Sequence, residues 1–195
     1  MQSITPAIAT SYCFAAIQMF YNEEKQHWIA ISFQDSQVKV FDSCFAGKLD
    51  ASLELQLSQM YSPLTESCGL LVSVVPMQQQ SSQTLNCGPF CIAAAYHTVL
   101  GDDVGSLTYD EERIRSHLTH CFEQEELSPF PLAPTGTEVS QAPQQNLLIE
   151  INCTCRRPDS LDNMVACDSC DCWFHLSCVK LKTAPVGDWF CAACQ

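Results

Sequence analysis

The chain has 195 residues, of which 22 are acidic and 9 are Lys or Arg, giving a formal net charge of −13 at pH 7. Direct binding of nucleic acid is therefore not expected, whereas basic partners fit the sign of the charge. No apolar run approaches membrane-spanning length, and no basic segment precedes the apolar N-terminal stretch, so we expect neither a membrane span nor a signal peptide. The 14 cysteines allow a disulfide framework, but without a signal peptide a reducing compartment is the better expectation.

The first predicted elements are three strands. Residues 17–22 are rich in apolar and aromatic side chains, and residues 27–34 alternate apolar with small or polar ones, as a strand with one buried face does. A third strand is expected at residues 38–43, after the turn-prone Asp35 and Ser36. The second and third strands are therefore expected to form a β-hairpin.

The register of this hairpin decides where two polar side chains lie. If Gln34 pairs with Gln37, His27 and Asp42 fall on one face as diagonal neighbours, with Cα atoms roughly 7 to 8 Å apart. A loop one residue longer or shorter would place them on opposite faces. Their proximity is therefore a prediction that depends on one register.

A helix and a buried strand follow. Residues 50–61 combine leucines with polar side chains and are helix-prone, and the apolar run at residues 69–77 is expected to be a buried strand. A polar, glutamine-rich run covers residues 78–83.

Two more helices are predicted in the middle of the chain. The first begins near Cys87, where Pro89 suits a first turn because its missing N–H is not needed there, and Gly101 ends it. The second is amphipathic and covers residues 108–122. The following residues are rich in Pro, Thr, Gln and Ser, which indicates a linker over residues 127–149.

Three of these residues point to nucleophilic catalysis. A histidine oriented by a carboxylate activates a nucleophile, and Cys87 is the natural third member beside His27 and Asp42 because a helix N-terminus favours the thiolate. A glutamine just upstream of Cys87 is placed to donate its side-chain amide to the oxyanion that forms on attack. The chain order His, Asp, Gln, Cys is therefore chemically complete.

These residues resemble the ubiquitin-like-protein (SUMO) protease family of papain-like cysteine peptidases, in its transposon-associated branch. His27 followed by Trp28, the FDS that contains Asp42, the glutamine run and NCGPF carry the resemblance, which extends over roughly residues 15–132. It implies a papain-like α+β fold and cleavage of ubiquitin-like conjugates. It also implies that His27 is the general base, Asp42 the orienting acid and Cys87 the nucleophile.

The chain departs from this family at three places. Asn86 stands where the family usually has Asp, which removes no catalytic group. The oxyanion glutamine usually lies six residues before the cysteine, where this chain has Ser81; we assign the role to Gln80, although Gln83 lies closer to the cysteine. Only 26 residues precede His27, so the peptidase domain is expected to be short at its N-terminus.

The C-terminal segment carries metal-type ligands at zinc-finger spacing. They run CxC, eleven residues, CxxC, four residues, HxxC, twelve residues, CxxC. The eight ligands are Cys153, Cys155, Cys167, Cys170, His175, Cys178, Cys191 and Cys194. They suffice for two tetrahedral zinc ions, which a segment too small for a large core needs for stability. Spacing alone allows sequential or interleaved pairing, and Cys172 is a spare thiol.

This ligand order, with Trp189 two residues before the last CxxC, resembles the PHD finger over residues 151–195. The resemblance implies interleaved pairing around two zinc ions. One ion would be held by Cys153, Cys155, His175 and Cys178, and the other by Cys167, Cys170, Cys191 and Cys194.

The PHD resemblance also implies binding of the N-terminal tail of histone three. In methyl-lysine readers, aromatic or Met side chains surround the ammonium group. Met164 and Trp173 match two such positions, while Asn152 and Asp159 stand at positions that are often aromatic. An acidic group there favours a lysine that still has N–H groups to donate, and Asp168 is expected to contact basic residues of the tail.

Together these patterns predict a SUMO-protease-like domain at residues 1–126 and a PHD finger at residues 150–195, joined by the linker at 127–149. The protein is expected to be nuclear, to cleave conjugates of ubiquitin-like proteins and to bind a histone tail. The alternative is a non-enzymatic chromatin-binding protein whose protease domain has become a scaffold.

Overall fold

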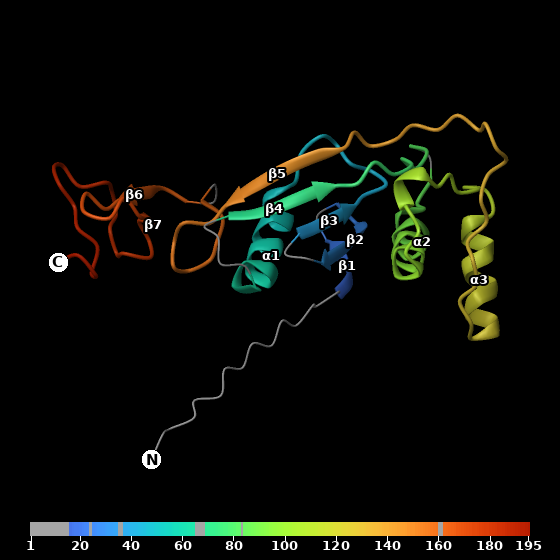
Figure 1. Ribbon diagram of the computed structural model, residues 1–195, viewed down its shortest axis with the longest axis horizontal. Coiled ribbons are helices and arrows are strands. Elements are labelled where there is room, and N and C mark those ends of the chain that lie inside the picture. Colours follow the sequence, from blue (N-terminus) through green and yellow to red (C-terminus); the bar gives the residue numbers. More distant parts are fainter. Residues whose placement is uncertain (1–15, 24, 35–36, 65–68, 83, 160–161) are drawn as a thin grey trace, which may run out of the picture.

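In the described part of the chain, the fold combines a mixed sheet, three α-helices and a C-terminal finger (Figure 1). The computed structural model describes residues 16–195 except 24, 35–36, 65–68, 83 and 160–161. Within these residues the predicted mixture of helices and strands is confirmed. None of the helices in the described part of the chain combines the length and the apolar character needed to cross a bilayer.

Five strands form the main sheet in the order β1-β2-β3-β4-β5. They are β1 (Ala16–Asn22), β2 (His27–Gln34), β3 (Gln37–Phe41), β4 (Gly69–Val74) and β5 (Gln145–Glu150). All neighbouring strands are antiparallel except β3 and β4, which run parallel because α1 (Ala51–Tyr61) lies in the connection between them. The remaining elements are η1 (Ser62–Leu64), α2 (Cys87–Leu100), η2 (Val104–Ser106), α3 (Ile114–Gln124), β6 (Met164–Ala166) and β7 (Trp173–His175).

The hairpin of β2 and β3 has the predicted register, with Gln34 paired to Gln37. Asp35 and Ser36, predicted as its turn, lie outside the described residues. The period-2 alternation of β2 sends Ile29 to one face of the sheet and Ala30 to the other. The register that brings His27 and Asp42 to one face is therefore present.

Helices cover both faces of the sheet, and each covered face forms a core. Leu53 and Leu57 of α1 are buried in one core with alternate residues of β2, β3 and β4. Phe90 and Ala94 of α2 are buried in the second core, which also contains Ile114 at the start of α3. Because α2 packs against this face of the sheet, its first residue, Cys87, lies close to the start of β2.

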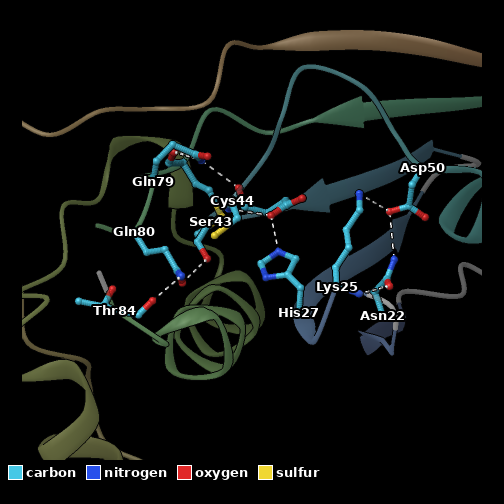
Figure 2. A network of polar contacts seen from close by, with 11 residues as sticks. Asn22, Lys25, His27, Ser43, Cys44, Asp50, Gln79, Gln80 and Thr84 are labelled. Atoms are coloured by element: carbon cyan, nitrogen blue, oxygen red, sulfur yellow. Dashed lines mark hydrogen bonds and ion pairs between the residues drawn. The ribbon is translucent and has the colours of Figure 1, made fainter. Parts of the chain in front are cut away.

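The start of α1 is tied to the hairpin of β1 and β2. Asp50 is the N-cap residue, and its Oδ1 accepts the N–H of Leu53 at 2.9 Å. Its Oδ2 accepts bonds from the amide of Asn22 at 3.1 Å and from the ammonium of Lys25 at 3.0 Å (Figure 2). One carboxylate therefore connects the loop that precedes His27 to the helix on the sheet.

The helix predicted at residues 108–122 begins later, at Ile114. Tyr109 is 1% exposed and forms a bridge with Leu132, which is extended rather than helical pairing. Only after Asp110, whose carbonyl accepts the N–H of Ile114 at 2.9 Å, does the backbone become helical. Tertiary pairing overrides local helix propensity here.

Part of the stretch predicted as a linker at residues 127–149 belongs to the folded sheet domain. β5 pairs with β4 from Gln145 to Glu150, and Phe130 and Ala142 are buried. Ile151, directly after β5, is 1% exposed and packs in the core under α1. The finger therefore begins directly after a core residue, without a free spacer.

Candidate functional site

The predicted zinc ligands lie in two clusters of four in the finger. Within each cluster the ligand atoms lie within 4.8 Å of one another, as the ligands of one tetrahedral ion do. The first cluster consists of Cys153, Cys155, His175 and Cys178, and the second consists of Cys167, Cys170, Cys191 and Cys194. This is the interleaved pairing, and Cys172 belongs to neither cluster.

A hydrogen bond selects the nitrogen of His175 that is available to zinc. Nε2 donates to the carbonyl of Pro158 at 3.1 Å, which leaves Nδ1 as the ligand atom, 3.3 Å from Sγ of Cys155. His175 is fully buried at the end of β7, so the imidazole has little freedom to reorient. Zinc in this site links the strand pair of the finger to the residues that follow β5.

Backbone N–H groups favour the thiolate form of one cysteine in each cluster. The N–H of Cys191 donates to Sγ of Cys167 at 3.3 Å and lowers the pKa of Cys167 to about 6. Burial alone would raise the pKa of Cys153, but the N–H groups of Cys155 and His175 lower it to about 6. Because zinc binds the thiolate, Cys153 and Cys167 are prepared for the metal near neutral pH.

Met164 and Trp173 lie on one face of the β6–β7 pair. Trp173 pairs with Ala166, and Met164 pairs with His175, so Met164 and Trp173 are diagonal neighbours. The side chain of Trp173 is 47% exposed, which leaves its ring accessible to a ligand. The register therefore places an exposed aromatic ring and a methionine next to each other on this face.

The other predicted tail-binding residues have partners inside the finger. Asp159 accepts the backbone N–H of Asn152 at 3.0 Å and its side-chain amide at 2.6 Å, so a polar pair occupies two positions that are often aromatic. Asp168 accepts the N–H of Trp189 at 2.7 Å, which gives its carboxylate a structural partner that a histone tail would have to share. The ring of Trp189 packs edge-on against Phe174 with centroids 5.7 Å apart.

Upstream, His27 and Asp42 form a buried pair. Nε2 of His27 lies 2.6 Å from Oδ1 of Asp42, and the two side chains are 10% and 11% exposed. The same oxygen accepts the N–H of Cys44 at 2.7 Å, which fixes the carboxylate (Figure 2). Burial alone would lower the pKa of His27, but the hydrogen bonds and negative charge of Asp42 and Cys87 raise it above its usual value.

Cys87 is the first residue of α2 and is 8% exposed. Burial lowers the pKa of His27, whereas Asp42 and, to a smaller extent, Cys87 raise it, so the thiol lies near the imidazole. Because Nε2 is bonded to Asp42, Nδ1 is the ring nitrogen that is left for the thiol. The structure therefore brings together the three residues predicted as base, orienting acid and nucleophile.

Gln80, predicted to stabilise the oxyanion, lies beside this cluster. Its backbone N–H donates to the carbonyl of Ser43 at 2.9 Å, and its Oε1 accepts the Ser43 hydroxyl at 3.3 Å. Its amide donates to the carbonyl of Thr84 at 3.0 Å, which uses one of its two N–H bonds and leaves the other for a ligand (Figure 2). Gln83, the alternative closer to the cysteine, lies outside the described residues.

Further polar residues support this cluster, and one of them, Gln79, carries no sequence signal of its own. Gln79 donates to the backbone carbonyl of Asp42 at 2.9 Å and to that of Met77 at 3.2 Å. Together with Ser43 and Thr84 it joins the segment after β3 to the segment before α2 (Figure 2). Within the sequence Gln79 is an unremarkable member of the polar run at residues 78–83.

An apolar groove of about 430 Å³ adjoins this cluster. It runs between the start of the sheet and helices α2 and α3, and it reaches Gly88 and Pro89, next to Cys87. The Trp28 ring on its wall packs against Tyr21 with centroids 4.8 Å apart. The groove offers apolar contact to a chain segment that passes Cys87.

Known proteins resemble this chain in its finger. Residues 153–194 match the family model described as PHD-finger. Bromodomain adjacent to zinc finger domain protein 1A of Homo sapiens is 54% identical over 43 residues, which are 21% of this chain and 3% of that protein. Chromatin modification-related protein png1 of Schizosaccharomyces pombe is 48% identical over 46 residues, 22% of this chain and 16% of that protein. Transcription initiation factor TFIID subunit 3 of Xenopus laevis is 44% identical over 43 residues, 21% of this chain and 5% of that protein.

This chain thus spans no more than 16% of the length of these relatives. The similarity does not bear on residues 16–150, so the resemblance to SUMO proteases stays a prediction. No solved structure matches the chain. The family match and the two ligand clusters agree with each other, and residues 153–194 therefore form a PHD finger that holds two zinc ions.

Proposed function

We propose that this protein is a chromatin-associated protein of the nucleus that binds a histone tail through its PHD finger. The exposed ring of Trp173 beside Met164, on a finger held by two zinc sites, carries this proposal. Relatives such as the chromatin modification-related protein png1 support it, because their similarity lies in this finger. The net charge of −13 suits a basic tail as partner.

The polar pair Asn152 and Asp159 indicates which form of lysine the finger prefers. A carboxylate gains most from an ammonium group that still carries N–H bonds, whereas a trimethylated lysine has none to donate. Only Met164 and Trp173 supply the apolar contact that a trimethylated group needs. We therefore propose that an unmodified or monomethylated lysine is bound more tightly than a trimethylated one.

Calorimetric titration of the zinc-loaded chain with histone three tail peptides in each methylation state tests this proposal. Affinity is expected to fall as methyl groups are added. Trp173→Ala is expected to weaken binding at least tenfold, in the range of a lost aromatic contact with a cation. Val186→Ala, a fully exposed position of the same finger, is the matched control. Failure of every peptide to bind would rule out the tail-binding proposal.

The bond of 2.6 Å between His27 and Asp42, next to Cys87, supports a second function. We propose that the sheet domain is a papain-like cysteine peptidase that cleaves conjugates of ubiquitin-like proteins. The Cys87 thiol transfers its proton to His27, and the thiolate attacks the carbonyl carbon of the peptide or isopeptide bond. The Gln80 amide stabilises the oxyanion, His27 gives the proton to the leaving amine, and water then hydrolyses the thioester.

Electrophilic probes built on SUMO and on ubiquitin test the peptidase proposal. A C-terminal electrophile is expected to label Cys87 in the folded chain, and the label is expected to vanish in Cys87→Ala and to weaken in His27→Ala. Cys44→Ala is the matched control, because Cys44 is an exposed thiol beside Asp42. Label that persists in Cys87→Ala, or a folded chain without label, would contradict the peptidase proposal and leave the non-enzymatic chromatin-binding protein.

A further inference from the structure

The segment that leads into Cys87 is held by side chains from a distant part of the chain. It runs from Ser81 to Asn86 and connects the glutamine run to α2. Its described residues lie in no helix or strand. Contacts from the region where α3 begins therefore decide where this segment lies.

One carboxylate, that of Glu111, makes most of these contacts. It accepts the backbone N–H of Ser81 at 2.9 and 3.2 Å and the Ser81 hydroxyl at 2.8 Å. It also accepts the Thr84 hydroxyl at 2.6 Å. Burial alone would raise the pKa of Glu111, but the bonds from Thr84 and Ser81 lower it, so the carboxylate is ionised and holds both Ser81 and Thr84.

Arg115 holds the rest of the segment. Its Nε donates to Oδ1 of Asn86 at 3.3 Å, and its guanidinium also donates to the carbonyl of Leu85. Buried Ile114, 0% exposed in the core with Phe90 of α2, anchors the backbone between Glu111 and Arg115. The two charged side chains are thus presented to the segment from a fixed support.

These contacts determine where the side chain of Asn86 points. Asn86 is the N-cap residue of α2, yet its side chain accepts no N–H of that helix in the described structure. Its Oδ1 is bonded to Arg115, and its Nδ2 lies 3.4 Å from the carbonyl oxygen of Glu111 and 3.5 Å from Oε1 of the same residue. An asparagine at an N-cap normally covers the N–H groups of the first turn. Here the side chain is turned away from the end of the helix that carries Cys87.

We propose that Glu111 and Arg115 are positioning residues for the peptidase chemistry: they draw Asn86 away from the helix cap and hold the Ser81–Asn86 segment in place. This leaves the first N–H groups of α2 available to the thiolate or oxyanion and keeps Cys87 facing His27. It also fixes Gln80, because the amide of Gln80 donates to the carbonyl of Thr84, whose hydroxyl is bound by Glu111. The inference rests on the proposed peptidase function.

The rate of Cys87 alkylation by iodoacetamide as a function of pH, measured on the full zinc-loaded chain by peptide mass spectrometry, tests this role. In Glu111→Ala, Ser81 and Thr84 lose the carboxylate that holds them, so the segment is expected to shift and let Asn86 cap the helix. The rate should then fall on the order of tenfold, and the pH of half-maximal rate should rise. Loss of a nearby negative charge alone would shift that pH downward, because it would favour the thiolate. The direction of the shift therefore distinguishes positioning from a simple charge effect.

Three variants complete the experiment. Glu111→Gln keeps an oxygen acceptor for Ser81 and Thr84 and is expected to recover part of the rate, and it serves as the test if Glu111→Ala does not fold. Arg115→Ala frees Oδ1 of Asn86 and is expected to slow alkylation as Glu111→Ala does, but only the Glu111 variants distinguish positioning from charge, because loss of a positive charge also disfavours the thiolate. Glu112→Gln, an exposed neighbour, is the matched control and is expected to behave as wild type.

The outcomes separate the two proposals. If wild-type Cys87 reacts no faster than Cys44, the peptidase proposal fails. If wild-type Cys87 is reactive but folded Glu111→Ala keeps the rate and pH profile of Glu112→Gln, the positioning role is overturned while the peptidase proposal stands. A downward shift of the profile in Glu111→Ala also overturns the positioning role.

Discussion

At the scale of single residues, the protonation of His27 is set by two neighbouring side chains, of which Asp42 has the larger effect. The pKa of His27 in the folded chain is raised above its ordinary 6.5 by the hydrogen bonds and charge of Asp42 and Cys87, against the effect of burial. Protonated His27 therefore contributes stability that is fully present below the unfolded pKa and is lost as pH rises through the folded pKa. The pair should stabilise the sheet domain most in mildly acidic solution.

Asp42→Asn is expected to remove this contribution. Its unfolding free energy should lie on the order of 2 kcal/mol below that of wild type at about pH 5.5, as for a lost charged hydrogen bond, and the difference should shrink at about pH 8.5. Urea unfolding at the two pH values measures it. Asp188→Asn, an exposed position in the finger, is the control. If the difference in unfolding free energy between Asp42→Asn and wild type does not vary with pH, the charge of Asp42 is not what holds the proton on His27.

Single residues with a diagnostic spacing were predictable, and those that act across the fold were not. The zinc ligands have a spacing typical of two four-ligand sites, and the hairpin register alone placed His27 beside Asp42. Glu111 and Arg115 carried no such signal, because only the packing of α3 against α2 brings them to the segment before Cys87. Local patterns cannot report contacts created by tertiary packing.

At the scale of elements, alternation and helix caps were reliable signals, and composition was not. The alternating residues of β2 and the Gly101 that ends α2 in a left-handed conformation gave boundaries close to those observed. Strand β5 escaped prediction because Gln145 and Asn146 continue the polar composition of the preceding stretch. Its pairing with β4 provides the backbone hydrogen bonds that its sequence does not predict.

The cap of α1 allows a test at this scale. Burial alone would raise the pKa of Asp50, but the N–H of Leu53 and the ammonium of Lys25 lower it, so its contribution is present above its unfolded pKa and is lost as pH falls through the folded value. Asp50→Ala is expected to cost about 1 to 2 kcal/mol of unfolding free energy near pH 7. Lys25→Ala, which removes only an exposed ion pair, is expected to cost less than about 1 kcal/mol. Equal losses in urea unfolding would show that the cap contributes nothing beyond the ion pair.

At the scale of the whole molecule, only a very short connection joins the sheet domain to the finger. Ile151 is buried under α1, and Cys153, a ligand of the first zinc site, follows two residues later and is also buried. The orientation of the start of the finger is therefore set by the core of the sheet domain. A histone tail bound to the finger would be held at a restricted distance from the His27 cluster.

Ile151→Ala tests whether this junction is part of the core. Removing a fully buried isoleucine leaves a cavity, so a loss of about 2 to 5 kcal/mol is expected in urea unfolding of the zinc-loaded chain. Val186→Ala is the control for an exposed aliphatic position. The zinc content should stay at two ions per chain, because Ile151 supplies no ligand. A loss below about 0.5 kcal/mol would show that the finger is attached through a free linker.

Zinc removal is expected to unfold the finger and to leave the sheet domain folded. A strong chelator is expected to unfold residues 153–194, since binding energy on the order of 10 kcal/mol per structural zinc is lost and the finger has little core of its own. The sheet should persist, because Ile149 and Ile151 are held by apolar packing under α1 and not by metal. After chelation, amide spectra should lack the finger signals and keep those of β2 and β4. In a separate measurement, metal analysis should find two zinc ions in Cys172→Ser but fewer in Cys170→Ser. Loss of the sheet signals together with those of the finger would mean that zinc, and not the apolar core, holds β5 in place.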